Sequence, residues 1–149
     1  VAENLLLATK RGQRRGLRPR RLNQHTAEFK QITASMPNQL SDRLKTPTGS
    51  LSGGQRQALS FLMATIKRPE ILLLDEHTAA LDPKTSTELM VATQERITAD
   101  HLTALMITHQ LSDAVKYGNR LLVLRNGQIT QDLNAEEKAR ADLRELSIY

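Results

Sequence analysis

The sequence predicts an α/β fold with an all-helical part at its N-terminal end, and three observations support this prediction. Before residue 70 the apolar residues recur only at helical spacing. Beyond it, two short apolar runs at 71–74 and 103–108 alternate with helical segments, as the strands of a parallel sheet do. With 149 residues, of which 39% are hydrophobic, the chain can bury the core of one domain.

The beginning of the chain is expected to form helices only. Glu3–Lys10 predicts a Leu-rich helix, and Arg21–Met36 predicts a second one that Pro37 ends, since proline lacks the N–H that a helix interior needs. Leu40 and Leu44 indicate one or two further turns. The side chains of the second helix that are expected to face inward are Leu22, Phe29, Ile32 and Met36.

The middle of the chain is expected to alternate helices and strands. An all-apolar run such as 71–74 is typical of a strand that is buried on both faces of a parallel sheet. In chain order the pattern predicts a helix over Gln55–Lys67, a strand over Ile71–Leu74, a helix over Pro83–Thr98, a strand over Thr103–Thr108 and a helix over Leu111–Tyr117.

A hairpin and a capped helix are expected towards the C-terminal end. Leu121–Leu124 and Gln128–Leu133 flank the pair Asn126-Gly127, which favours the positive backbone angles of a two-residue hairpin turn. Asn134 is a good N-cap for a last helix that continues to about Leu146.

The composition excludes several classes of protein. Without cysteine, the chain cannot carry a disulfide scaffold, a thiolate metal site or a cysteine nucleophile. It has no apolar run of the roughly 18 residues that a transmembrane helix needs, and its first residues do not have the pattern of a secretion signal.

The positive charge is concentrated near the start of the chain. Residues 1–45 hold ten of the 21 basic residues but only three of the 16 acidic ones, and seven of the ten lie between Lys10 and Arg21. Such a stretch suits either a nucleic-acid or acidic-membrane surface or a solvated loop. No aromatic residues interleave with these arginines, so base stacking has no platform and no nucleic-acid partner is expected.

The segment Ser52-Gly53-Gly54-Gln55 lies just before a predicted helix. Glycines allow backbone N–H groups to approach an anion closely, and the N-terminus of a helix favours negative charge. The segment therefore predicts a phosphate cradle, in which the hydroxyl of Ser52 adds a further donor. The alternative is an ordinary flexible loop in which Ser52 is an N-cap.

Polar side chains follow both predicted strands. Asp75 and Glu76 end the first, where burial of two acids is costly unless a cation or a proton donor compensates it. Asp75 suits Mg²⁺ held through water, and Glu76 could polarise an attacking water. His109 follows the second strand and is expected at the same edge of the sheet, where it could contact a phosphate. The alternatives are two exposed turn acids and a surface histidine.

Four motifs together resemble those of the ATP-binding cassette (ABC) ATPases, in the order and at the separations usual in that family. They are Leu51–Gln57, which resembles the signature motif, Ile71–Glu76, which resembles the Walker B strand with its catalytic glutamate, Ala80–Asp82, which resembles the D-loop, and Ile107–His109, which resembles the switch-histidine loop. Val1–Leu5 also resembles the segment that opens the helical subdomain, so the resemblance covers nearly the whole chain.

Two features depart from the family pattern. No glycine is followed by lysine, so the P-loop motif G-x-x-x-x-G-K-[ST] is missing, as are the upstream Q-loop and the aromatic residue that stacks on adenine. His77 stands where the family usually has proline.

The resemblance implies a P-loop NTPase (RecA-like) core fragment with an all-helical subdomain at its N-terminal end. Residues 1–50 would form the helical subdomain, 51–69 the signature loop and helix, and 70–149 the C-terminal half of the ATPase core, with the upstream Walker A half absent.

The resemblance also implies roles for the residues that match. Cassettes of this family work as head-to-tail pairs with two ATP molecules between them. Glu76 would act on the attacking water, Asp75 would support Mg²⁺, and His109 would hold the γ-phosphate. The signature residues would contact the ATP held by the opposite subunit. Asp82 would report across the interface between the subunits. The implied nucleotide-binding residues are therefore Ser52, Gly53, Gly54, Gln55 and Asp82.

The function that follows is the ATP-binding and ATP-hydrolysing subunit of a bacterial ABC transporter, similar to the amino-acid importer branch. Its partners would be a second cassette, in a homodimer, and transmembrane permease subunits at the cytoplasmic face of the membrane. The 149 residues by themselves are expected to be inactive, since they lack the P-loop. The alternatives are a soluble ABC ATPase of translation or chromosome maintenance, or a non-catalytic remnant that acts as a binding module.

Overall fold

The structure, a computed structural model, describes residues 1–13 and 22–141. It contains two compact units, Val1–Leu105 and Met106–Tyr149, which are described separately. No helix within the described residues is both long enough and apolar enough to span a lipid bilayer.

The first unit begins with short helices and contains no strand among its described residues before residue 71, as the sequence predicts. These elements are α1 (Ala2–Thr9), the 3-10 turn η1 (Leu22–His25), α2 (Thr26–Ala34), the 3-10 turns η2 (Leu40–Arg43) and η3 (Thr48–Ser50), and α3 (Gly53–Thr65). The helix predicted over Arg21–Met36 is therefore a 3-10 turn followed by a shorter α-helix, and Arg21 lies outside the described residues.

The core of this helical part is apolar and tightly closed. Leu5, Phe29 and Leu40 have no exposed surface, and Met36 is buried as expected. Leu22 and Ile32 are only half-buried, which corrects the prediction that they face inward. Thr33 takes an inward position instead, because its hydroxyl donates to the Phe29 carbonyl (2.6 Å) and so satisfies its own polar group inside the core.

Part of the basic stretch has a structural role. The guanidinium of Arg11 donates to the carbonyls of Met63 (3.2 Å) and Ala64 (3.1 Å) at the end of α3, and Lys67 donates to the Arg11 carbonyl (2.8 Å). The last carbonyls of a helix have no partner within the helix, so the Arg11 guanidinium completes the C-terminus of α3, and Lys67 holds the Arg11 backbone in place. The stretch 14–21 lies outside the described residues.

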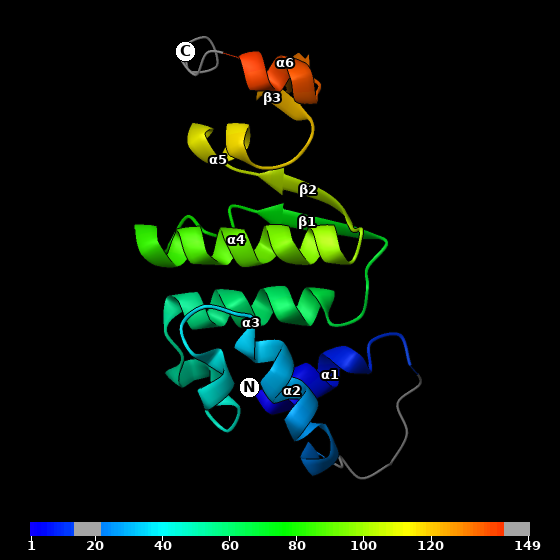
Figure 1. The fold of residues 1–149 in the computed structure, drawn as a ribbon, viewed down its shortest axis with the longest axis vertical. Helices are drawn as coiled ribbons and strands as arrows, with labels where there is room; N and C mark the ends of the chain where they lie inside the picture. The colour runs from blue at the N-terminus through cyan, green and yellow to red at the C-terminus, as the bar shows by residue number, and fades with distance from the viewer. Residues whose placement is uncertain (14–21, 142–149) are drawn as a thin grey trace. The chain divides into compact units, whose positions relative to one another are not determined.

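The strand β1 (Ile71–Asp75) leads to the long helix α4 (Pro83–Ala99), which lies beside α3 (Figure 1). β1 pairs with β2 (Thr103–Ile107) in a two-stranded sheet. The predicted burial on both faces of β1 is wrong. Leu72 and Leu74 are buried, but Ile71 is 55% and Leu73 67% exposed, because successive side chains of a strand point to opposite faces and only one face is covered.

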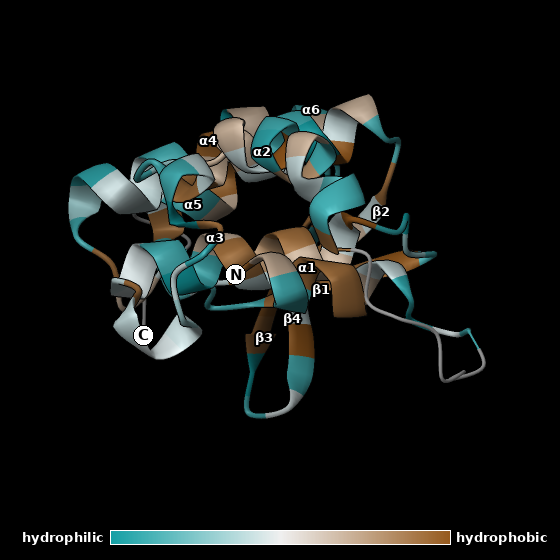
Figure 2. Cartoon of the chain, turned by 90° about the horizontal axis from the view of Figure 1, so that it is seen from below, coloured by the Kyte–Doolittle hydropathy of each residue, from teal (hydrophilic) through white to brown (hydrophobic). Residues whose placement is uncertain are grey.

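The second unit contains α5 (Leu111–Lys116), β3 (Leu121–Arg125), β4 (Gln128–Leu133) and α6 (Ala135–Arg140). The predicted hairpin is confirmed: β3 and β4 are antiparallel, and Asn126 and Gly127 both have positive φ (48° and 76°). Figure 2 shows hydrophobic residues along its strands and hydrophilic ones near its turn.

The last helix is capped as predicted but shorter. The side chain of Asn134 accepts from the backbone N–H of Glu136 (2.9 Å) and Glu137 (3.1 Å), which satisfies first-turn donors. Lys138 is buried and its ammonium donates to the carbonyls of Tyr117 and Gly118, which joins α6 to the loop between α5 and β3. The continuation predicted to Leu146 lies outside the described residues.

Candidate functional site

The candidate site is built around the N-terminus of α3, where Ser52 is the N-cap. The Ser52 Oγ accepts from the backbone N–H of Gln55 (3.2 Å), and the Gln55 Oε1 accepts from the backbone N–H of Ser52 (3.1 Å). This reciprocal pair is a capping box, and it fixes the direction in which the helix starts. Ser52 and Gly53 are exposed, so the capped end faces solvent.

The donors at this end suit an anion. The N–H groups of Gly53 and Gly54 belong to the first turn, where an α-helix provides no carbonyl partner of its own. The hydroxyl of Ser52 accepts from Gln55 and keeps its own hydrogen to donate. A phosphate oxygen placed over the helix axis would meet donors from Ser52, Gly53 and Gly54.

Gln55 fixes the loop through two hydrogen bonds of its side-chain amide. Its Oε1 accepts from Ser52, and its Nε2 donates to the backbone carbonyl of Asn38 (2.9 Å). One amide hydrogen is left for any other contact. Arg56 adds a second brace, because its guanidinium donates to the carbonyl of the buried Leu51 (2.6 Å).

The two glycines at the start of α3 differ in their surroundings. A methyl group on Gly54 would lie 2.5 Å from the Thr85 Cγ2 and 2.7 Å from the Asn38 Nδ2, closer than real side chains come. A methyl group on Gly53 would meet only the Leu81 Cδ2, at 3.8 Å. Gly54 is therefore needed for close packing of α3 against the start of α4, whereas Gly53 has space around it.

Asp82 is the N-cap of α4 and reaches the same region. Its Oδ1 accepts from the backbone N–H of Thr85 (3.0 Å), and this bond, together with one from the Thr85 hydroxyl, lowers the pKa of the carboxyl below its ordinary value. Because Thr85 also lies against Gly54, the structure brings Asp82 and the Ser52–Gln55 segment into one neighbourhood.

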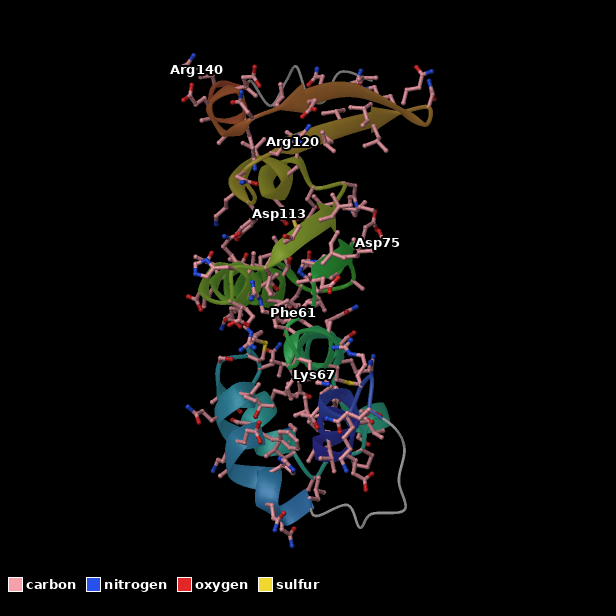
Figure 3. The ribbon with its side chains drawn as sticks, turned by 90° about the vertical axis from the view of Figure 1, so that its right-hand side faces the viewer. Phe61, Lys67, Asp75, Asp113, Arg120 and Arg140 are labelled. Atoms are coloured by element: carbon pink, nitrogen blue, oxygen red, sulfur yellow. The ribbon has the colours of Figure 1, made fainter. Side chains whose placement is uncertain are left out.

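Asp75 is the last residue of β1 (Figure 3), and Glu76 directly follows the strand. Both side chains are exposed, so the expectation that burial makes this pair costly is wrong for this structure. Glu76 has a positive φ of 44°, which is uncommon for a residue with a side chain. Its carbonyl accepts from the N–H of Ala79 (3.0 Å), so a tight turn holds this conformation.

His77 follows in the same turn. Its ring Nε2 lies 3.5 Å from the Oγ1 of the buried Thr93 in α4, a long contact that joins the turn to the helix.

His109 belongs to the second unit, two residues after β2, and its side chain is exposed. Within residues 1–13 and 22–141, no three histidine or acidic side chains gather to hold a metal ion.

Sequence reasoning missed Asn38, Arg56 and Thr85, which position the others. Two of them had a signal: an asparagine directly after Pro37 is typical of a turn with unusual backbone angles, and Arg56 lies within the Leu51–Gln57 motif.

The chain is similar to known proteins in family profile, in sequence and in structure. A family profile described as ABC transporter matches residues 1–79. The tyrosine transport ATP-binding protein of Clostridioides difficile (strain R20291) is 39% identical over 146 residues, which are 98% of this chain and 58% of that protein. The methionine import ATP-binding protein of Streptococcus thermophilus (strain CNRZ 1066) is 39% identical over 93 residues, 62% of this chain and 26% of that protein.

Among solved structures, the chain is similar to a dimeric ATP-binding cassette in a post-hydrolysis state bound to ADP and Pi. The TM-score is 0.68 at 25% identity, over 90% of this chain and 56% of that one. This likeness confirms the predicted fold class, an α/β cassette core with helices at its N-terminal end. The chain spans little more than half the length of either the tyrosine-transport relative or this cassette.

Proposed function

This chain belongs to the ABC transporter family, and from that premise we propose that it forms the signature and Walker B part of the ATP-hydrolysing subunit of a bacterial amino-acid importer. One observation carries the proposal: the exposed N-terminus of α3 presents a capped, braced set of donors that suits the terminal phosphate of a nucleotide. In this proposal the nucleotide is the one bound by the opposite cassette of a pair, as the resemblance of Leu51–Gln57 to the signature motif implies.

In this proposal Ser52, Gly53 and Gly54 donate to the γ-phosphate of ATP bound by the second cassette of a homodimer. Gln55 holds the loop in shape and contributes at most its one remaining amide hydrogen. Asp82, which caps α4 beside this loop, lies at the interface between the two cassettes and responds when the two cassettes come together.

Glu76 is the proposed base for the attacking water, and His109 steadies the γ-phosphate. The positive φ of Glu76 supports this role, because unusual backbone angles held by a turn concentrate at functional sites. Mg²⁺ would neutralise the phosphate charge, and Asp75 is the carboxylate that would hold it through water.

The larger assembly follows from the family. We propose a helical subdomain over 1–50, the signature loop and helix over 51–69, and the C-terminal half of the ATPase core over 70–149. The subunit would sit peripherally at the cytoplasmic face of the membrane, against transmembrane permease subunits. The similarity to a tyrosine-transport protein supports an amino-acid cargo.

The test is a cassette completed by joining the P-loop half of the C. difficile relative to this chain. Glu76→Gln should leave ATP binding and ATP-driven dimerisation intact and reduce phosphate release by at least about 100-fold, because the amide cannot take the proton of the water. Glu70→Gln is the matched control, since Glu70 is also exposed but lies before β1, at its opposite end.

The same change at Glu70 should leave phosphate release near normal. The unjoined 149-residue chain, which lacks the P-loop, should show no steady turnover. A Glu76→Gln cassette that releases phosphate at the unmodified rate would remove Glu76 from its role and the proposal with it.

A further inference from the structure

The turn that follows α2 has unusual backbone angles next to the signature loop. Asn38 and Gln39 are consecutive residues with positive φ, 62° and 53°. Residues with side chains rarely enter this region, and asparagine is among those that tolerate it best. Two such residues in a row mean that neighbouring contacts hold the turn in this shape.

Two contacts join Asn38 to the loop, one through its backbone and one through its side chain. Its carbonyl oxygen accepts from the Gln55 Nε2 at 2.9 Å. Its side-chain amide lies beside Gly54, since a methyl group there would be 2.7 Å from the Asn38 Nδ2. Gln39 is exposed, whereas Asn38 is half-buried.

The bond from Gln55 to Asn38 decides how the Gln55 amide is oriented. With Nε2 directed to Asn38, Oε1 is directed to the backbone N–H of Ser52. A rotated amide would put its NH₂ group against that N–H, donor against donor, and the capping box would open. The Asn38 carbonyl belongs to the peptide between Asn38 and Gln39, so the left-handed backbone of the turn sets its direction towards Gln55.

We propose that Asn38 is a positioning residue for the signature loop, acting through Gln55 to hold Ser52 in its capping geometry. The consequence for turnover rests on the proposed function above. The consequence for the Gln55 amide does not, and the two are measured separately.

The first measurement uses the 149-residue chain and the NMR signals of the Gln55 side-chain NH₂ group. Asn38→Ala removes the side-chain amide and disfavours the left-handed φ, so these signals should move to the positions of a solvated glutamine and exchange faster with water. Asn38→Gly removes the same amide but adopts positive φ without strain, so the signals should stay close to those of the unmodified chain.

Gln39→Ala is the control for loss of a neighbouring side chain, because Gln39 has nearly the same φ as Asn38, alanine keeps its Cβ, and its side chain is exposed. It should leave the Gln55 signals in place. If Asn38→Ala does not fold, Asn38→Gly and Gln39→Ala still test the proposal. Loss of the hydrogen bond from Gln55 in Asn38→Gly would show that the left-handed backbone at position 38 does not hold the Gln55 amide.

The second measurement uses the completed cassette. Asn38→Ala should lower the turnover number by about tenfold and change the KM for ATP by less than about twofold, since the loop acts on ATP held mainly by the other cassette. Asn38→Gly should restore most of the turnover. A role through the side-chain amide of Asn38 would not be rescued by glycine, whereas a role through its left-handed backbone would.

Unchanged Gln55 signals in Asn38→Ala, or an equal effect of Gln39→Ala, would overturn the proposal. So would normal turnover in Asn38→Ala while Glu76→Gln is inactive. If Glu76→Gln is fully active, the proposed function fails, and the Gln55 signals alone then decide whether Asn38 positions the loop.

Discussion

Replacing Gly54 by alanine tests whether close packing of α3 on α4 sets the geometry of the site. The added methyl group would lie 2.5 Å from the Thr85 Cγ2 and 2.7 Å from the Asn38 Nδ2. The asparagine amide is the end of a rotatable side chain and can move away. Thr85 cannot do so easily, because it is buried, β-branched and bonded to Asp82 through its backbone N–H.

The magnitude follows from two opposed effects. Overpacking of a tight contact costs about 1–3 kcal/mol of folding free energy. Alanine in place of glycine within a helix raises the free energy of unfolding by about 0.5–1 kcal/mol. The middle of each range gives a net decrease of about 1 kcal/mol in the free energy of unfolding for Gly54→Ala. Gly53→Ala, whose methyl group meets only the Leu81 Cδ2 at 3.8 Å, should be neutral or slightly stabilising.

Urea unfolding of the chain, followed by circular dichroism, measures both variants. With a slope of about 2 kcal/mol per molar urea, Gly54→Ala should lower the midpoint by roughly 0.5 M without a change of slope. Thr85→Ser removes the offending Cγ2 and keeps the hydroxyl, so the double variant should recover part of the loss. Equal midpoints for the two glycine variants, or no recovery by Thr85→Ser, would refute the reasoning.

Two further predictions concern pH and association. The Thr85 N–H lowers the pKa of Asp82. The contribution of this N-cap to folding stability should therefore be complete above the unfolded pKa of 3.8 and lost as the pH falls through the lower folded pKa. An NMR titration of the Asp82 carboxyl measures the folded pKa, and a midpoint above 3.8 would contradict the prediction. Ile71 and Leu73 leave an apolar face of β1 exposed, so the chain should self-associate in light scattering and Leu73→Glu should reduce this; a monomer with cooperative unfolding would show that the chain closes its own core.

Much of the local structure could be predicted from the sequence, because its determinants lie within a few residues of each other. The Asn126-Gly127 turn and the Asn134 cap are examples: each depends on backbone angles or hydrogen bonds that span at most three residues. The Ser52–Gln55 box is similarly local, and the sequence reasoning named both residues and the cap, although it preferred a phosphate cradle over the cap alone.

Burial was predicted less well, since it depends on what covers an element. The run 71–74 is apolar throughout, yet Leu73 is 67% exposed while its neighbours Leu72 and Leu74 are buried. The exposure of Asp75 and Glu76 has the same origin. Apolar composition indicates that a strand can be buried, but the covering layer is a property of the tertiary structure.

By itself the sequence determined the order of helices and strands, the hairpin turn, the helix caps and the motifs that mark the family. Only the tertiary structure decided which residues shape the site around those motifs. Asn38 meets Gln55 from 17 residues away, and Thr85 meets Gly54 from a different helix. No periodicity or spacing encodes such pairs, because they exist only once α2, α3 and α4 have packed and brought distant backbone atoms within hydrogen-bond and van der Waals distance.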